Sequence, residues 1–207
     1  MLWSIVIPVK TTQSAKSRLD LDGADRPRVA LAIALDTVAA AAAAELTGDV
    51  VVVTSDADVQ AGVDQIEGAR WIPDPGMGLN GAVRAGLERA ADEARAALLG
   101  DLPALRAHDL DRALLAATAE ERSYIPDAEE TGTVFVAWRG AATYEPHFGG
   151  GSATRHAEAG HVRLPIPTTN TVRRDVDTID QLAAARELGL GPRTTALLNA
   201  AEARRAA

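Results

Sequence analysis

Residues Asp49–Thr54 read DVVVVT, with valine at all four central positions. Such a uniformly apolar run does not suit a strand with one face open to water, where polar residues would alternate with apolar ones. It therefore predicts a strand that is covered on both faces of a sheet. Outward from this strand, short apolar runs alternate with Ala-rich stretches of helical period. We expect strands at 3–8, 49–54, 69–72 and 96–100, and helices at 27–46, 56–65, 80–95 and 109–120.

The second half of the chain departs from this alternation. Residues 123–126 and 133–138 look like two strands joined by an acidic turn, which predicts an added β-hairpin. A short helix ending at Glu158, a last strand at 161–166 and a helical stretch from Asp177 onward complete the pattern. The βαβα order predicts an α/β fold of Rossmann-like type, with helices on both faces of a mostly parallel central sheet.

Composition sets limits on function. The 207 residues fit one domain, and Lys+Arg 21 against Asp+Glu 29 gives a net charge of −8, which opposes bulk binding to DNA or RNA. The absence of cysteine excludes disulfides, thiolate zinc sites and cysteine nucleophiles. No uncharged apolar run reaches about 18 residues, so we expect no membrane span. The apolar start of the chain resembles a strand more than a signal peptide, so we expect a cytoplasmic protein.

Basic residues follow the first strand closely. Lys10, Lys16 and Arg18 form a local positive cluster in an acidic chain. Because ligands of such sheets bind beyond the carboxyl ends of the strands, this cluster suits a polyphosphate. The alternative is a solvated surface loop, since exposed Lys and Arg are the rule.

Acidic residues occur at two separate places. Asp101 follows the strand expected at 96–100, where a carboxylate can hold a divalent cation. Asp175 and Asp177 point to the same side of an extended segment and would repel each other without a cation. The alternatives are helix caps, with Asp101 before the helix at 109–120 and Asp177 at the start of the last helical stretch.

Glycines mark two further loops. Gly149, Gly150 and Gly151 precede Ser152, and their backbone N–H groups with the serine hydroxyl suit an anion. The alternative is a flexible turn with Ser152 as a helix cap. Asn80, after a glycine-rich turn, can pair with a base edge or cap the next helix. The four histidines show no metal-binding spacing, and we treat them as structural or surface residues.

Five motifs in chain order resemble the 2-phospho-L-lactate guanylyltransferase family, which includes phosphoenolpyruvate guanylyltransferases and belongs to the glycosyltransferase-A-like nucleotidyltransferases. They are PVKTTQSAKSRL (8–19), GLNGAVRAGL (78–87), LLGDLPAL (98–105), FGGGSATRH (148–156) and RRDVDTIDQL (173–182). The resemblance implies a three-layer α/β/α nucleotidyltransferase fold. It also implies Mg²⁺-dependent transfer of GMP from GTP to a three-carbon phospho-acid, with release of pyrophosphate, in the biosynthesis of the deazaflavin coenzyme F-420.

The same resemblance assigns roles to individual residues. Three would be catalytic: Lys16, Arg18 and Asp101. Five would bind the nucleotide: Lys10, Lys16 and Arg18 at the phosphates, and Leu79 and Asn80 beside the guanine. Three would bind the acceptor: Thr133, Gly149 and Ser152. Three would hold the metal: Asp101, Asp175 and Asp177. Gly150 stands where the family often has proline, which we expect to loosen the acceptor turn.

We expect one nucleotidyltransferase domain over residues 1–207, with a nucleotide-binding half at 1–122 and an acceptor-binding half at 123–207. GTP and a phosphorylated three-carbon acid are the expected partners, and the resemblance allows a homodimer. The spacing does not decide between phosphoenolpyruvate and 2-phospho-L-lactate. Two alternatives remain open: another nucleotidyltransferase of this fold that acts on a cofactor or sugar phosphate, and a non-catalytic nucleotide-binding protein.

Overall fold

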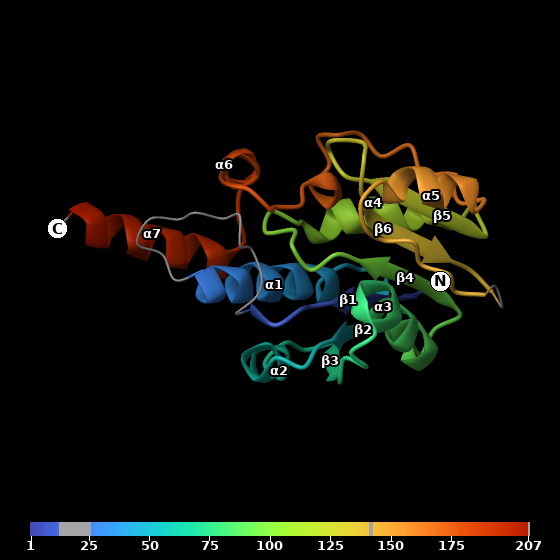
Figure 1. Ribbon diagram of the computed structural model, residues 1–207, viewed down its shortest axis with the longest axis horizontal. Coiled ribbons are helices and arrows are strands. Elements are labelled where there is room, and N and C mark those ends of the chain that lie inside the picture. Colours follow the sequence, from blue (N-terminus) through green and yellow to red (C-terminus); the bar gives the residue numbers. More distant parts are fainter. Residues whose placement is uncertain (13–25, 141–142, 207) are drawn as a thin grey trace.

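The computed structural model describes residues 1–12, 26–140 and 143–206 (Figure 1). Within these residues, seven strands form one sheet in the order β3-β2-β1-β4-β6-β5-β7. The strands are β1 (Trp3–Pro8), β2 (Thr47–Val53), β3 (Ala69–Ile72), β4 (Ala94–Leu98), β5 (Arg122–Pro126), β6 (Thr133–Trp138) and β7 (Val162–Arg163). Only β6 runs antiparallel to its neighbours β4 and β5 among these pairings. The prediction of a mostly parallel sheet with an added hairpin is confirmed.

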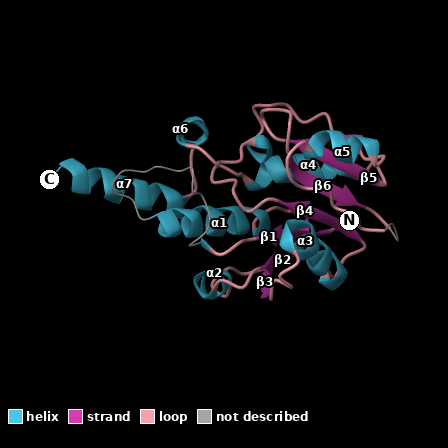
Figure 2. Ribbon diagram, viewed as in Figure 1, coloured by secondary structure: helices cyan, strands magenta, loops and turns pink. Residues whose placement is uncertain are grey.

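Helices cover both faces of this sheet (Figure 2). They are α1 (Arg26–Ala42), α2 (Ala57–Val63), α3 (Gly78–Arg89), α4 (Ala107–Ala117), α5 (Ser152–Glu158), α6 (Ile179–Leu188), α7 (Pro192–Ala206) and the short 3₁₀ helix η2 (Thr171–Arg173). In the described parts of the chain, no helix combines the length and apolar character that crossing a bilayer needs.

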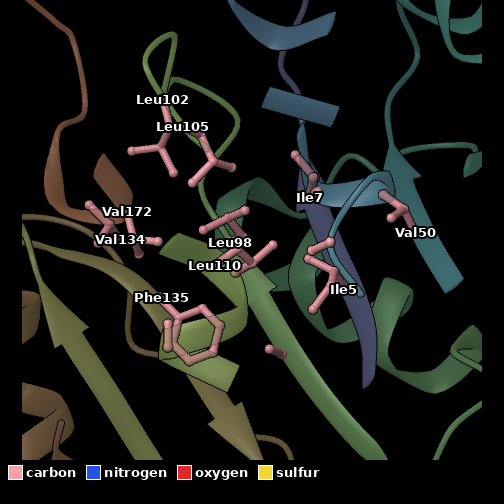
Figure 3. Close-up of a cluster of buried hydrophobic side chains, with 14 of the residues drawn as sticks. Ile5, Ile7, Val50, Leu98, Leu102, Leu105, Leu110, Val134, Phe135 and Val172 are labelled. Carbon is pink, nitrogen blue, oxygen red and sulfur yellow. The ribbon is translucent and has the colours of Figure 1, made fainter. Parts of the chain in front are cut away.

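The period of two along the strands divides the core into two layers. Ile5 and Ile7 point to the face covered by α1, α2 and α4, where Leu98, Leu110 and Phe135 join the same buried cluster (Figure 3). On the opposite face, residues such as Val6, Val51 and Val136 pack against α3 and α5. This arrangement is the three-layer α/β/α fold that the resemblance implies.

Gly86 allows α3 to approach the sheet closely. A Cβ atom at this position would lie 2.3 Å from Cγ1 of Val6 and 2.9 Å from Cγ2 of Val53. Only glycine therefore fits here without displacing the helix from β1 and β2.

The sequence-based boundaries differ from the structure by a few residues at most elements, and three differences have a clear cause. The helix expected at 80–95 ends at Arg89, because residues 94–98 pair with β1 despite their helical composition. The strand expected at 161–166 has only two residues, since Pro165 and Pro167 have no N–H with which to extend the ladder. The helical stretch expected from Asp177 onward is two helices, α6 and α7, separated at Gly189–Gly191.

A buried aspartate joins α7 to α1. Asp36 of α1 is only 4% exposed, and its carboxylate accepts hydrogen bonds from the backbone N–H groups of Arg193 (3.1 Å) and Thr194 (2.8 Å). These are first-turn N–H groups of α7, which have no partner inside their own helix. Asp36 therefore caps α7 from a neighbouring helix, and α7 lies beside α1 in Figure 1.

We expect Asp36→Ala to lower the free energy of unfolding by about 1–3 kcal/mol, because it leaves two backbone N–H groups of α7 without their acceptor. Urea denaturation followed by far-UV circular dichroism measures this change. Glu88→Ala on the exposed side of α3 is the control, with an expected change within about 0.5 kcal/mol. Equal stability of the two variants would show that Asp36 does not hold α7.

Candidate functional site

One cleft of about 750 Å³ lies beyond the carboxyl ends of β1 and β4. It gathers residues from β1, α1, the loop after β4, the start of β6, the loop before α5 and the segment after η2. Most of the predicted site residues line it: Lys10, Leu79, Asp101, Thr133, Gly149, Ser152, Asp175 and Asp177. The predicted residues Lys16 and Arg18 lie outside the described residues.

Three carboxylates meet at this cleft. Asp101, Asp175 and Asp177 each place one oxygen within 4.8 Å of the others, although the first is separated from the other two by more than 70 positions. The N–H group of Val176 donates to the carbonyl oxygen of Asp101 at 3.0 Å. Val176 itself is fully buried, so its two acidic neighbours are turned away from the core. The prediction that the three aspartates lie close together is confirmed.

The helix-cap alternatives do not hold for these aspartates. The residue that caps α6 is Thr178, whose side chain and that of Gln181 form a reciprocal capping box. Helix α4 begins at Ala107, well after Asp101. Asp177 is therefore not the cap of α6, and it lines the cleft.

Burial and neighbouring negative charges change the pKa of Asp175. Burial, followed by the carboxylates of Asp101, Asp127 and Glu129, raises the pKa of Asp175 to about 7. A site that raises the pKa of a carboxyl group in this way favours a proton or a cation. Three carboxylates with oxygen ligands only are the donor set that Mg²⁺ prefers. The residues present therefore fit a divalent cation.

Two networks hold the segment that carries Asp175. The carboxylate of Asp109 on α4 accepts hydrogen bonds from Thr171 Oγ1 (2.7 Å) and from Asn170 Nδ2 (3.3 Å). The guanidinium of Arg173, only 2% exposed, donates to the carbonyl oxygens of Pro126 (3.0 Å), Ile166 (3.0 Å) and Asp127 (2.6 Å) and to the carboxylate of Glu130 (2.5 Å). These contacts fix η2 against α4 and against the β5–β6 turn.

One part of the cleft begins at the end of β1. Lys10 is exposed there and lines the cleft. Two residues later, the N–H and the hydroxyl of Thr12 both donate to Oδ2 of Asp56, at 2.7 and 2.8 Å. Burial raises the pKa of Asp56, but the hydrogen bonds from Thr12, Val59 and Asp58 outweigh it and lower the pKa overall. An ionised Asp56 thus fixes the direction in which the chain leaves β1.

Leu79 and Asn80 lie in the first turn of α3. Leu79 lines the cleft, whereas the Asn80 amide forms two hydrogen bonds with the backbone of Phe148: Oδ1 accepts from its N–H (2.8 Å) and Nδ2 donates to its carbonyl oxygen (3.2 Å). Asn80 does not cap α3, which begins two residues earlier. Its amide links α3 to the loop that precedes α5.

Another part of the cleft is made from β6 and the loop before α5. Thr133 and Ser152 are 3% and 1% exposed, and both line the cleft with Gly149. The helix cap of α5 is Gly151 (φ 70°), so the alternative of Ser152 as a cap is wrong. Gly149 has a φ of 119°, a conformation that favours glycine.

Several residues that organise this site have no signal in the sequence. Asp127, Thr131 and Gly132 line the cleft as part of the β5–β6 turn, where the Asp127 carboxylate accepts hydrogen bonds from the N–H groups of the other two residues (2.9 and 2.6 Å). His156 contacts Thr133, and Arg173 holds the segment that carries Asp175. A single polar residue inside an apolar pattern does not indicate which distant group it will contact.

The chain matches one protein family over most of its length. The family described as "Guanylyl transferase CofC like" matches residues 3–182. A phosphoenolpyruvate guanylyltransferase of Streptomyces scabiei is 46% identical over 207 aligned residues, covering 95% of each chain. A protein of the same name from Salinispora arenicola is 46% identical over 205 residues, covering 97% of this chain and 95% of the relative.

Solved structures show the same fold at low identity. A putative nucleotide-diphospho-sugar transferase from Desulfovibrio desulfuricans superposes with a TM-score of 0.72 at 18% identity, covering 98% of this chain and 96% of that one. A nucleotidyl transferase from Methanothermobacter gives 0.59 at 15% identity, covering 90% and 96%. With the family match over most of the chain and relatives of 46% identity, these findings show that the chain belongs to the CofC-like guanylyl transferase family.

Proposed function

We propose that this protein is a guanylyltransferase that transfers GMP from GTP to a three-carbon phospho-acid and releases pyrophosphate, in the biosynthesis of coenzyme F-420. The observation that carries the proposal is a single cleft that combines three converging carboxylates with the predicted acceptor residues. The name of the relatives favours phosphoenolpyruvate over 2-phospho-L-lactate as the acceptor. The same name and the complete carboxylate set count against a sugar-phosphate transferase and against a non-catalytic protein.

The reaction begins when an oxygen of the acceptor's phosphate attacks the α-phosphorus of GTP. A new phosphorus–oxygen bond forms, and the bond from the α-phosphorus to the bridging oxygen of the β-phosphate breaks, so that pyrophosphate leaves. The nucleophile is already an anion, so the protein needs no general base. The main barrier is electrostatic, because two polyanions must approach each other.

The described residues would reduce this repulsion between the two substrates in two ways. Asp101, Asp175 and Asp177 would hold Mg²⁺ at the cleft, and when bound, Mg²⁺ neutralises phosphate charge and polarises the reacting phosphoryl group. Lys10 lines the same cleft and would bind the phosphates of GTP, together with Lys16 and Arg18 from the segment outside the described residues. On the other side, Thr133, Gly149 and Ser152 would bind the phosphate and carboxylate of the acceptor.

We expect Asp101→Asn to lower kcat by about 10²–10³, or roughly 2.7–4 kcal/mol, by analogy with the loss of one charge-stabilising contact in an active site. Pyrophosphate release from GTP with phosphoenolpyruvate measures this loss. Asp180→Asn, at an exposed position on α6, is the matched control and should keep wild-type activity. Full activity of Asp101→Asn with an unchanged requirement for Mg²⁺ would show that Asp101 is not a metal ligand.

We expect Asp175→Asn to stabilise the metal-free protein, by on the order of 1–3 kcal/mol, because it removes one of three carboxylates that repel each other. The same change should reduce the stabilisation that Mg²⁺ gives to the wild type. Urea unfolding in EDTA and in excess Mg²⁺ measures both effects, again with Asp180→Asn as the control. Unchanged stability in EDTA, with a full response to Mg²⁺, would contradict the proposed metal site.

We expect Ser152→Ala to raise the KM for phosphoenolpyruvate about 10-fold or more while the KM for GTP stays near the wild-type value. The reason is that one hydrogen bond to a charged group contributes about 1.5–3 kcal/mol. Steady-state kinetics with each substrate varied in turn separates the two constants. An equal rise in both constants would indicate that Ser152 only supports the fold.

A further inference from the structure

A buried histidine lies directly behind the acceptor side of the cleft. His156 of α5 is fully buried, and its ring lies among Tyr124, Phe148 and His161, with ring centroids 6.1, 5.4 and 5.3 Å away. It is not among the residues that line the cleft. Both of its ring nitrogens nevertheless contact elements that do, so the ring connects β6 with the loop before α5.

The partners of the ring determine where its proton lies. Nε2 is 3.0 Å from the backbone nitrogen of His147, and a backbone N–H group can only donate. Nε2 must therefore carry the lone pair, and in a neutral ring the proton lies on Nδ1. Burial, with His161 and His147 nearby, lowers the pKa of His156 to about 3, so the ring is neutral under ordinary conditions.

The proton on Nδ1 in turn determines the role of Thr133. Nδ1 is 3.1 Å from Oγ1 of Thr133, so the ring donates and the hydroxyl oxygen accepts. The hydroxyl proton of Thr133 is then directed elsewhere. Since Thr133 lines the cleft, a ligand there is a candidate acceptor for that proton.

We propose that His156 is a positioning residue that makes Thr133 a hydrogen-bond donor toward the anionic acceptor. The proposal rests on the proposed function, because the acceptor is taken to be a phospho-acid. Phosphate and carboxylate oxygens only accept hydrogen bonds, so they need donors around them. The opposite tautomer of His156 would accept the proton of Thr133 and turn a lone pair toward the acceptor. His156 thus favours an anion beside the hydroxyl group of Thr133, although the histidine itself does not line the cleft.

Two substitutions separate the two nitrogens of the ring. An asparagine places its amide near the position of Nδ1, so His156→Asn can still donate to Thr133 but loses the contact with His147. A glutamine reaches the position of Nε2, so His156→Gln can still accept from His147 but loses the donor to Thr133. Thr133→Val removes the hydroxyl, and Thr133→Ser keeps it.

The expected result is a split between the variants in the KM for phosphoenolpyruvate. We expect His156→Gln and Thr133→Val to raise this constant about 10-fold or more, and His156→Asn and Thr133→Ser to stay within about 3-fold of the wild type. The KM for GTP should not change in any of them. The double variant Thr133→Val with His156→Gln should be no worse than Thr133→Val alone, because both remove the same contact.

Three outcomes would overturn the proposal. One is an equal loss in His156→Gln and His156→Asn, another is a KM for GTP that rises in step with that for phosphoenolpyruvate, and the third is a double variant whose losses add. If the changes at His156 prevent folding, the two variants at Thr133 still test the role of its hydroxyl group. Thr133→Val must then lose acceptor binding while Thr133→Ser keeps it.

A spectroscopic measurement separates this proposal from the proposed function. Long-range ¹H–¹⁵N NMR of the wild type reports the tautomer of each histidine without any turnover, with His156→Asn used to assign the signals. We expect a protonated Nδ1 and an unprotonated Nε2 at His156, and the opposite tautomer would refute the proposal. A wild type that has this tautomer but releases no pyrophosphate from GTP with phosphoenolpyruvate would instead refute the proposed function.

Discussion

The structure depends on keeping three negative charges together at the edge of a sheet. Carboxylates within 4.8 Å of each other repel, and this protein holds Asp101 beside Asp175 and Asp177 by contacts that surround them. The backbone bond from Val176 to Asp101 sets the distance, and burial of the Val176 side chain against α6 and α7 resists its rupture. Repulsion at the cleft is thus offset by apolar packing behind it.

The same constraint explains what the C-terminal part of the chain does. Helices α6 and α7 contribute the small apolar cluster around Val176, which includes Ala104 beyond the end of β4. The cap that Asp36 provides to α7 belongs to this support, since it fixes α7 on α1. Residues far from the cleft therefore help to determine the geometry of the three carboxylates.

The added hairpin brings Thr133 to the same edge of the sheet as Asp101. β4 runs parallel to β1 and ends at Leu98, whereas β6 runs antiparallel and begins at Thr133. The N–H group of Leu99 donates to the carbonyl oxygen of Val134 at 2.9 Å, so the end of one strand lies beside the start of the other.

The sequence predicts those features that depend on periodicity or on strand ends. The valines of 49–54 predict the buried parallel sheet, and the position of Asp101 after a strand predicts a carboxylate at its edge. The expectation that Asp175 and Asp177 join Asp101 there comes from the family resemblance. The sequence does not predict contacts of single buried polar groups. Arg173 had no role in the sequence pattern, yet it ties three segments together, and Asn80 uses its amide on a backbone 68 residues away.

In the loop before α5, side-chain contacts stand in for the proline that the resemblance leads us to expect at Gly150. Gly150 stands in place of a proline, which predicts a looser turn, yet the turn is held from three sides. Asn80 bonds to both backbone groups of Phe148, His156 accepts from the N–H of His147, and the Arg155 guanidinium donates to the carbonyl oxygens of His147 (2.9 Å) and Gly150. Side chains from α3 and α5 thus supply the order that a proline ring would give. Because the chain's own side chains order this loop, a ligand bound against it would lose less conformational entropy.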